Sequence, residues 1–196
     1  MNDLNAPIDD YGPKIIYASR THSQISQFVG EIKKTVYCKE KVVTLGSRKN
    51  MCINSKVSRL SSLPQINDEC LDLQKKKEHS CEFKRSGEEE TQIMDSFAIH
   101  LQASIKDIEE IVEMGQKMHT CPYYGSRAAV TDSDVICLPY NLLLQKSSRE
   151  ACQISLKNSI VIIDEAHNVV DTINSIHSIS INNNQVSLKD CSSNMG

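Results

Sequence analysis

The chain has 196 residues, of which 39% are hydrophobic and 24% charged, so it is long enough to bury a real core. This composition excludes wholesale disorder, and no apolar run approaches the roughly 20 residues that a membrane-spanning helix needs. The net charge of −3 is not the strongly basic balance of a protein that holds DNA by charge alone. Because residues 1–11 are polar and acidic, they do not form a secretory signal, and we expect an intracellular chain.

The first elements follow a strand–helix–strand order. Residues 14–18 (KIIYA) form an apolar run that predicts a buried strand, and residues 19–21 predict a turn. Residues 22–34 carry apolar side chains at helical spacing, which indicates an amphipathic helix. Residues 42–45 predict a second short strand. This order is typical of the beginning of an α/β sheet.

The strand pattern is interrupted in the middle of the chain. Between residues 48 and 121 no convincing strand is found, and residues 74–90 are polar. The end of this block predicts one long amphipathic helix from the spacing of Ile93, Phe97, Leu101, Ile105, Ile108, Ile111 and Val112. The block therefore has the character of a partly helical insertion within a larger sheet.

The α/β order then resumes. Residues 134–138 (DVICL) predict a strand, and residues 139–146 begin a helix. Residues 159–163 (SIVII) are β-branched after the serine, as in a central strand of a parallel sheet. Beyond residue 178 the sequence is rich in Asn and Ser and predicts no clear element.

Two carboxylates, Asp164 and Glu165, directly follow this last strand. In a parallel sheet they would lie at the carboxyl edge, where open α/β folds bind ligands. One carboxylate could hold Mg²⁺, and the other could orient the water that attacks a γ-phosphate. The alternative is that they merely open a helix and are stabilised by its dipole.

The turn after the first strand offers groups that suit a phosphate. Arg20 and His22 stand among the hydroxyls of Ser19 and Thr21 at the start of a helix, where backbone N–H groups also point outward. The alternative is that Ser19 and Thr21 only cap the helix. The two interpretations are compatible.

The sequence holds eight cysteines, which in a reducing compartment are metal ligands or buried thiols rather than disulfides. Those inside the interrupted block are Cys52, Cys70, Cys81 and Cys121. Their spacing contains no CxxC pair and alone favours free buried cysteines. Cys137 lies in an apolar strand and is expected in the core.

Several segments together resemble the XPD-like iron–sulfur helicases of superfamily two, which carry a DEAH box. These segments are YASRTHSQISQ, LGSRKNMC, NDEC, HTCPYYGSR, LPYNLLL and IVIIDEAHN. Within that family they look most like the Chl-type branch linked to sister-chromatid cohesion. The resemblance implies an incomplete RecA-like parallel sheet with a mainly helical iron–sulfur insertion.

The resemblance also implies roles for particular residues. Asp164 would serve Mg²⁺, Glu165 would activate water, and His167 would couple the nucleotide site to the neighbouring motor domain. The residues implied to touch the backbone of single-stranded DNA are Ser19, Arg20, Thr21 and His22. The implied ligands of a [4Fe–4S] cluster are Cys52, Cys70, Cys81 and Cys121.

Other features carry alternatives or depart from the family. Arg48 and Lys49 could neutralise the cluster, contact DNA or form an ordinary solvated pair. The context of Cys81, CEFKR, lacks the more usual proline after the cysteine.

The family pattern divides the chain into five parts. Residues 1–13 are a polar lead, residues 14–50 and 123–178 are two parts of a motor domain, and residues 51–122 are the cluster insertion. Residues 179–196 form a tail in which an arch domain could begin.

One family motif is absent. None of the seven glycines belongs to a GxxxxGK[ST] P-loop, the motif that cradles ATP phosphates. We therefore expect a fragment of an ATP- and Mg²⁺-dependent 5′–3′ helicase that has negligible ATPase activity alone.

The family context supplies the remaining expectations: a nuclear location, single-stranded and forked DNA as partners together with cohesion or replication-fork proteins, and no membrane. Two alternatives stay open. One is a non-catalytic module that binds DNA or protein, and the other places zinc on the cysteines.

Overall fold

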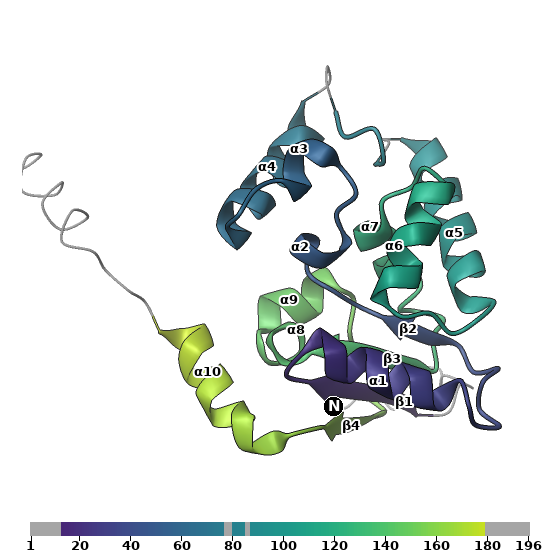
Figure 1. The fold of residues 1–196 in the computed structure, drawn as a ribbon, viewed down its shortest axis with the longest axis vertical. Coiled ribbons are helices and arrows are strands. Elements are labelled where there is room, and N and C mark those ends of the chain that lie inside the picture. Colours follow the sequence, from purple (N-terminus) through teal and green to yellow (C-terminus); the bar gives the residue numbers. More distant parts are fainter. Residues whose placement is uncertain (1–12, 77–79, 85–86, 179–196) are drawn as a thin grey trace, which may run out of the picture.

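The computed structural model describes residues 13–76, 80–84 and 87–178, and its centre is a four-stranded parallel sheet (Figure 1). The strands are β1 (Lys14–Ser19), β2 (Val42–Thr44), β3 (Val135–Pro139) and β4 (Ser159–Ile163), in the order β2-β3-β1-β4. In the register of the sheet, Tyr17 lies opposite Cys137 on one side and Ile162 on the other. The prediction of an α/β fold with a parallel sheet is confirmed.

One face of the sheet is covered by α1 (His22–Ile32). Side chains on a strand alternate between faces, so Tyr17 and Cys137 point to the same side. They form a buried cluster with Ile25 and Val29 of α1. Cys137 is fully buried, as predicted, and burial raises the pKa of its thiol to about 12.

The other face is covered by α5 (Glu88–Gln102), α6 (Ile108–Lys117) and α7 (Pro122–Ala128). Ile16 and Ile136 of the sheet share one core cluster with Phe97 of α5 and Ile111 of α6. The late part of the interrupted block is therefore packed directly on the sheet.

The prediction of one long helix over this block is wrong. The chain leaves the helical path after Gln102, and Asp107 begins α6 with a capping box in which its carboxylate accepts the Glu110 N–H at 2.9 Å. The break also lets Ile105 pack in the cluster beneath α1, whereas Ile108 packs in the core cluster on the other face of the sheet.

The first part of the block forms a small satellite core. It consists of α2 (Arg48–Met51), α3 (Ser55–Ser58) and α4 (Leu63–Lys75). Val57, Ile66 and Leu73 are buried together, with three cysteines packed against them. No strand occurs between residues 48 and 121 in the described part of this block, as predicted.

The chain returns to the sheet through two short helices, α8 (Tyr140–Leu144) and α9 (Lys146–Ala151), and enters β4. A 3₁₀ turn, η1 (Ala166–Asn168), then leads into α10 (Val169–His177), which points away from the body in Figure 1. The predicted tail, residues 179–196, lies outside the described residues.

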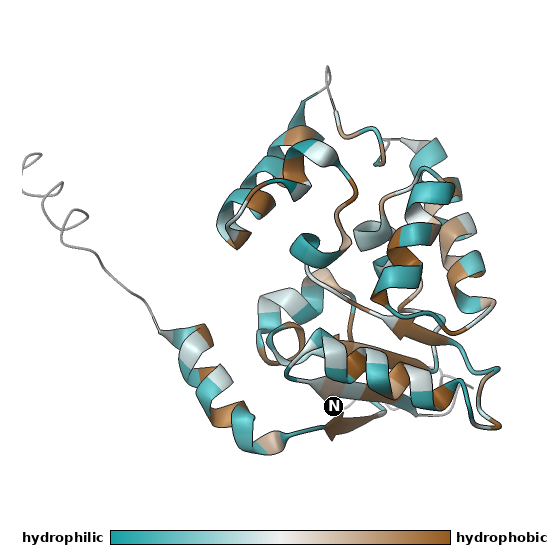
Figure 2. Cartoon of the chain, in the orientation of Figure 1, coloured by the Kyte–Doolittle hydropathy of each residue, from teal (hydrophilic) through white to brown (hydrophobic). Residues whose placement is uncertain are grey.

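The expectation that Ser159–Ile163 is a central strand is wrong for this chain. Among the described strands β4 pairs with β1 alone, and its isoleucines and valine are 36–52% exposed (brown in Figure 2). Among the described helices, none has both the length and the apolar character needed to cross a bilayer.

Candidate functional site

Asp164 is held at the carboxyl edge of the sheet by two contacts with β1. Its backbone N–H donates to the carbonyl of Ala18 at 2.9 Å, which extends the pairing of β4 with β1 by one residue. The hydroxyl of Tyr17 donates to Asp164 Oδ2 at 2.8 Å, while its ring stacks on Phe28 with centroids 3.7 Å apart. The carboxylate is therefore fixed in direction by a ring that cannot turn freely.

Glu165 has a left-handed backbone, with φ 52° and ψ 44°. This conformation turns the chain from the strand into η1, and a non-glycine residue adopts it only at a steric cost. The Glu165 carboxylate lies 3.2 Å from His167 Nδ1, and Asn168 Nδ2 lies 2.9 Å from His167 Nε2. The structure thus brings the three predicted catalytic residues to one turn.

The DEAH turn and the turn after β1 are joined by a hydrogen bond. Arg20 Nη1 donates to Asn168 Oδ1 at 2.9 Å. This bond links the two turns directly through their side chains.

The two hydroxyls of the predicted phosphate-binding turn serve the chain itself. Thr21 caps α1 in a capping box with Gln24, and Ser19, which is fully buried, donates to Gln24 Oε1 at 2.8 Å. The capping interpretation is confirmed for Thr21, and the structure leaves Ser19 no exposed surface.

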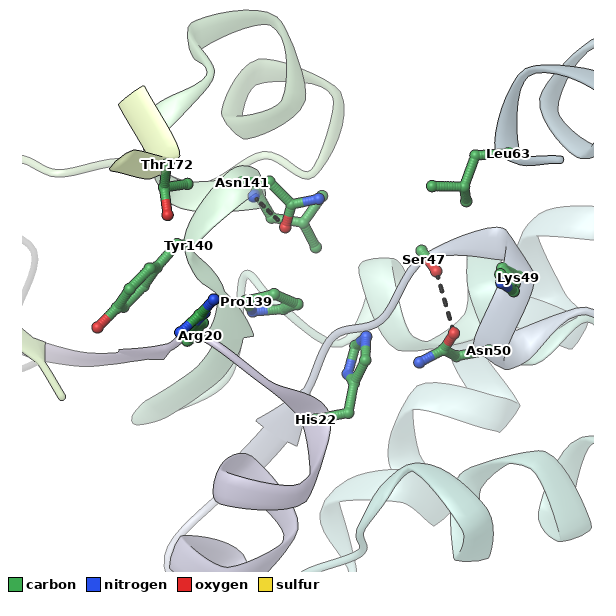
Figure 3. Close-up of a pocket in the computed structure, with 11 residues that line it drawn as sticks. Arg20, His22, Ser47, Lys49, Asn50, Leu63, Pro139, Tyr140, Asn141 and Thr172 are labelled. Atoms are coloured by element: carbon green, nitrogen blue, oxygen red, sulfur yellow. Dashed lines mark hydrogen bonds between the residues drawn. The ribbon is translucent and has the colours of Figure 1, made fainter. Parts of the chain in front are cut away.

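Arg20 and His22, the other two residues of the turn after β1, line a pocket of about 290 Å³ (Figure 3). Arg20 and His22 share this lining with residues of α2, such as Lys49, with the segment 139–142 after β3 and with Thr172 of α10. The pocket therefore joins the sheet edge, the first insertion helix and the last helix.

His22 lines this pocket as a half-buried side chain. Its Nδ1 has no hydrogen-bond partner among the described residues, and burial lowers its pKa from 6.5, although Glu109 acts in the opposite direction. Because Nδ1 is itself buried, a ligand could reach it only if the ring moved, and the positive charge of the pocket comes from Arg20 and Lys49.

Arg48 does not line the pocket. Its guanidinium donates to the Tyr124 hydroxyl at 2.9 Å and to Asn67 Oδ1 at 3.2 Å, and lies 4.3 Å from the centre of the Tyr123 ring. These contacts tie α2 to α4 and α7. Of the predicted DNA contacts, then, the structure brings Arg20 and His22 together, and it packs Arg48 against α4 and α7.

The four predicted cluster ligands lie around the satellite core. Cys52, Cys70 and Cys81 pack against it, and Cys121 is close enough that the charges of Cys81 and Cys52 affect its pKa. Burial is the main cause that raises the pKa of Cys121, to about 11. Because buried neutral thiols resist ionisation, a positively charged centre would be needed to hold them as thiolates.

Each of these sulfurs receives an N–H donor. The backbone N–H groups of Tyr124 and Tyr123 point at Cys121, and that of Asn54 points at Cys52. Side-chain amides point at Cys81 and Cys70. Within the described residues, however, no three His, Cys, Asp or Glu side chains converge closely enough to hold one metal ion.

The comparisons with known proteins fit this geometry. The family model DEAD_2 matches residues 17–186, which is most of the chain. The chain belongs to the DEAD_2 family.

Relatives agree with this family assignment. The chain is 44% identical to the ATP-dependent DNA helicase CHL1 of Yarrowia lipolytica over 197 residues, which cover 95% of this chain and 24% of the relative. It is 47% identical to the ATP-dependent DNA helicase chl1 of Schizosaccharomyces pombe over 181 residues, covering 90% of this chain and 21% of the relative. The chain thus spans about a quarter of these relatives, and the predicted resemblance to XPD-like, Chl-type helicases is confirmed.

Solved structures agree on the fold. The chain resembles an XPD helicase with a TM-score of 0.55 and 19% identity, covering 84% of this chain and 26% of the other. A truncated XPD gives the same TM-score at 20% identity, covering 85% and 44%.

Sequence reasoning within this DEAD_2 chain missed several supporting residues. Tyr17 lies inside a quoted motif, but only the adjacency of β1 and β4 reveals its bond to Asp164. Tyr140 is buried, its hydroxyl has no partner in the described part of the chain, and burial, Asp164 and Glu165 all raise its pKa. The signal for Tyr140 was its place directly after a strand, at the same edge as the DEAH box.

Proposed function

We propose that this chain supplies part of the first motor domain of an ATP-dependent 5′–3′ DNA helicase, which couples ATP hydrolysis to duplex unwinding. The observation that carries the proposal is the fixed pair Asp164 and Glu165 at the carboxyl edge of a parallel sheet. The DEAD_2 membership and the names of the relatives support it.

The residues divide the chemistry between them. Asp164 would bind Mg²⁺, which neutralises charge on the phosphates when it is bound. Glu165, whose carboxylate lies beside His167, would orient the attacking water. His167, within reach of Glu165 and Asn168, would pass the state of this site to Arg20 and the DNA-facing turn.

DNA would pass the mouth of the pocket between Arg20 and Lys49. Two cations, Arg20 and Lys49, suit the phosphates of the DNA backbone. Ser19 and Thr21 would act indirectly, by holding the turn, and Arg48 would act by supporting the insertion.

We further propose that Cys52, Cys70, Cys81 and Cys121 bind a [4Fe–4S] cluster. Four sulfurs around one small core, each with an N–H donor, suit an anionic ligand set. A single zinc ion needs four ligand atoms within about 2.3 Å of the metal, whereas the four ligand sulfurs of a cluster lie farther apart. Zinc on the same four sulfurs is the alternative, and the anaerobic preparation described below distinguishes the two.

The catalytic part of the proposal is tested best in a chimera. This chain would replace the matching segment of the S. pombe relative, which supplies the remaining motor parts. We expect DNA-stimulated ATP hydrolysis and 5′–3′ unwinding, both lost with Glu165→Gln. A folded chimera that binds DNA but hydrolyses no ATP would overturn the proposal.

The chain alone should show negligible ATPase activity, because phosphoryl transfer needs the phosphate cradle that a P-loop provides. DNA-stimulated ATP turnover by the purified chain, abolished by Glu165→Gln, would contradict this expectation.

The second candidate is a non-catalytic module that binds DNA through the pocket. Binding of single-stranded DNA that weakens steeply with salt, together with an inactive chimera, would favour it.

Anaerobic preparation distinguishes a cluster from zinc, since a cluster gives a brown protein whose visible absorption is lost with Cys121→Ser.

We propose a nuclear location and roles in replication, repair and cohesion on the strength of the relatives.

A further inference from the structure

Two side-chain amides point at two of the four cysteine sulfurs. Asn54 Nδ2 donates to Cys81 Sγ at 3.5 Å, and Gln74 Nε2 donates to Cys70 Sγ at 3.5 Å. These distances suit N–H···S hydrogen bonds, because sulfur is larger than oxygen. The amides come from different elements, since Asn54 precedes α3 and Gln74 lies near the end of α4.

The surroundings fix which end of each amide faces the sulfur. Asn54 is only 7% exposed, and its Oδ1 accepts the Lys56 N–H at 3.0 Å to cap α3. Its NH₂ group is therefore left for Cys81. One hydrogen of Gln74 Nε2 is donated to the Tyr124 hydroxyl at 2.8 Å, and the other is shared between the Cys70 carbonyl at 3.1 Å and the Cys70 sulfur. A carbonyl oxygen in that place would meet another acceptor, so the NH₂ group must occupy it.

The other two sulfurs depend on backbone donors. Cys121 receives the N–H groups of Tyr123 and Tyr124, and Cys52 receives that of Asn54. A substitution that changes only a side chain leaves these backbone donors in place. The donors to Cys70 and Cys81 belong to side chains, so a substitution can remove them.

We infer that Asn54 and Gln74 are positioning residues that raise the reduction potential of the cluster. This inference rests on the [4Fe–4S] assignment above. Reduction adds one electron, taken from an electrode in the experiment, and breaks no bond to the protein. Each N–H···S bond stabilises the more negative, reduced form, so its loss makes reduction harder.

The test uses the reconstituted chain under anaerobic conditions, with the midpoint potential measured by spectroelectrochemical titration. Gln74→Met keeps an unbranched side chain without the donor, and Asn54→Ser keeps an oxygen for the Lys56 N–H. The matched control is Gln65→Met, an exposed position on the same helix. We expect a lower potential in each single variant, a further fall in the double variant, and no change in the control.

The possible outcomes separate the role of the two amides from the cluster assignment on which it rests. Potentials of both variants equal to that of Gln65→Met overturn this inference and leave the cluster assignment intact. A colourless wild-type chain overturns both. If Gln74→Met does not load, Gln74→Glu keeps the side-chain length, removes the donor and adds negative charge. Its potential must then fall, and an unchanged value refutes the role of Gln74.

Discussion

At the scale of single residues, the left-handed backbone of Glu165 predicts that glycine at this position makes the folded chain more stable. A left-handed backbone costs a non-glycine residue about 1–2 kcal/mol, and glycine avoids most of this cost. Glu165→Gly should therefore raise the free energy of unfolding by about 1 kcal/mol, measured by urea denaturation. Glu165→Ala removes the carboxylate but keeps the strain, so it should give no gain. Equal stabilities for the two variants would contradict the prediction.

His22 predicts a pH dependence of stability. Burial lowers its pKa in the folded chain below 6.5, so the unfolded chain binds the proton more readily. The stability that this histidine contributes is therefore present above about pH 6.5 and is lost as the pH falls through the folded pKa. His22→Gln should flatten the decline of unfolding free energy between pH 8 and pH 5. His100→Gln, at an exposed position, is the control, and parallel curves for wild type and His22→Gln would refute the idea.

Residue identities could be predicted where a chemical role leaves a local pattern. The carboxylates after β4, the capping Thr21 and the buried Cys137 were each visible in a few neighbouring letters. The bonds from Tyr17 to Asp164 and from Asn54 to Cys81 were not. They join positions far apart in the chain, and a single sequence holds no record of that proximity.

At the scale of elements, strands could be predicted more reliably than the helical block. β1 and β4 are short apolar runs whose limits show in composition. The break between α5 and α6 was missed because Leu101, Ile105 and Ile108 keep helical spacing across it. Asp107 with Glu110 was the available signal, since a capping box marks a helix start.

The contact between α5 and α7 predicts a sharp response to one methyl group. A Cβ on Gly125 would lie 2.3 Å from Phe97 Cδ1, so Gly125→Ala must displace a fully buried ring or α7 itself. We expect a loss of about 1–3 kcal/mol in unfolding free energy. Cys121 caps α7, so cluster loading should fall as well.

The matched control is Gly30→Ala, inside α1, where a Cβ would meet nothing within 4 Å. It should stabilise the chain by about 0.5–1 kcal/mol, because alanine favours the helix. Both variants would be compared by urea denaturation and by visible absorption of the reconstituted protein. Similar effects of the two substitutions would show that α5 and α7 do not pack as described.

At the scale of the whole molecule, the parallel fold was predictable and the strand order was not. β1 and β3 are neighbours although more than a hundred residues separate them, and only packing decides that. The composition of β4 correctly signalled a strand suited to burial on both faces. In this chain its faces stay partly exposed, because no described helix packs extensively on them.

That edge predicts self-association of the purified chain. Ile160 and Val161 expose 52% and 40% of their surface on opposite faces of a strand with an unpaired side, which offers a template for another strand. Ile160→Lys with Val161→Lys should reduce the concentration-dependent mass seen in sedimentation velocity. Val36→Lys with Tyr37→Lys adds the same charge at exposed apolar positions after α1. Since these positions lie away from the edge, this control should associate as the wild type does. An equal reduction by both pairs would assign the effect to net charge and not to β4.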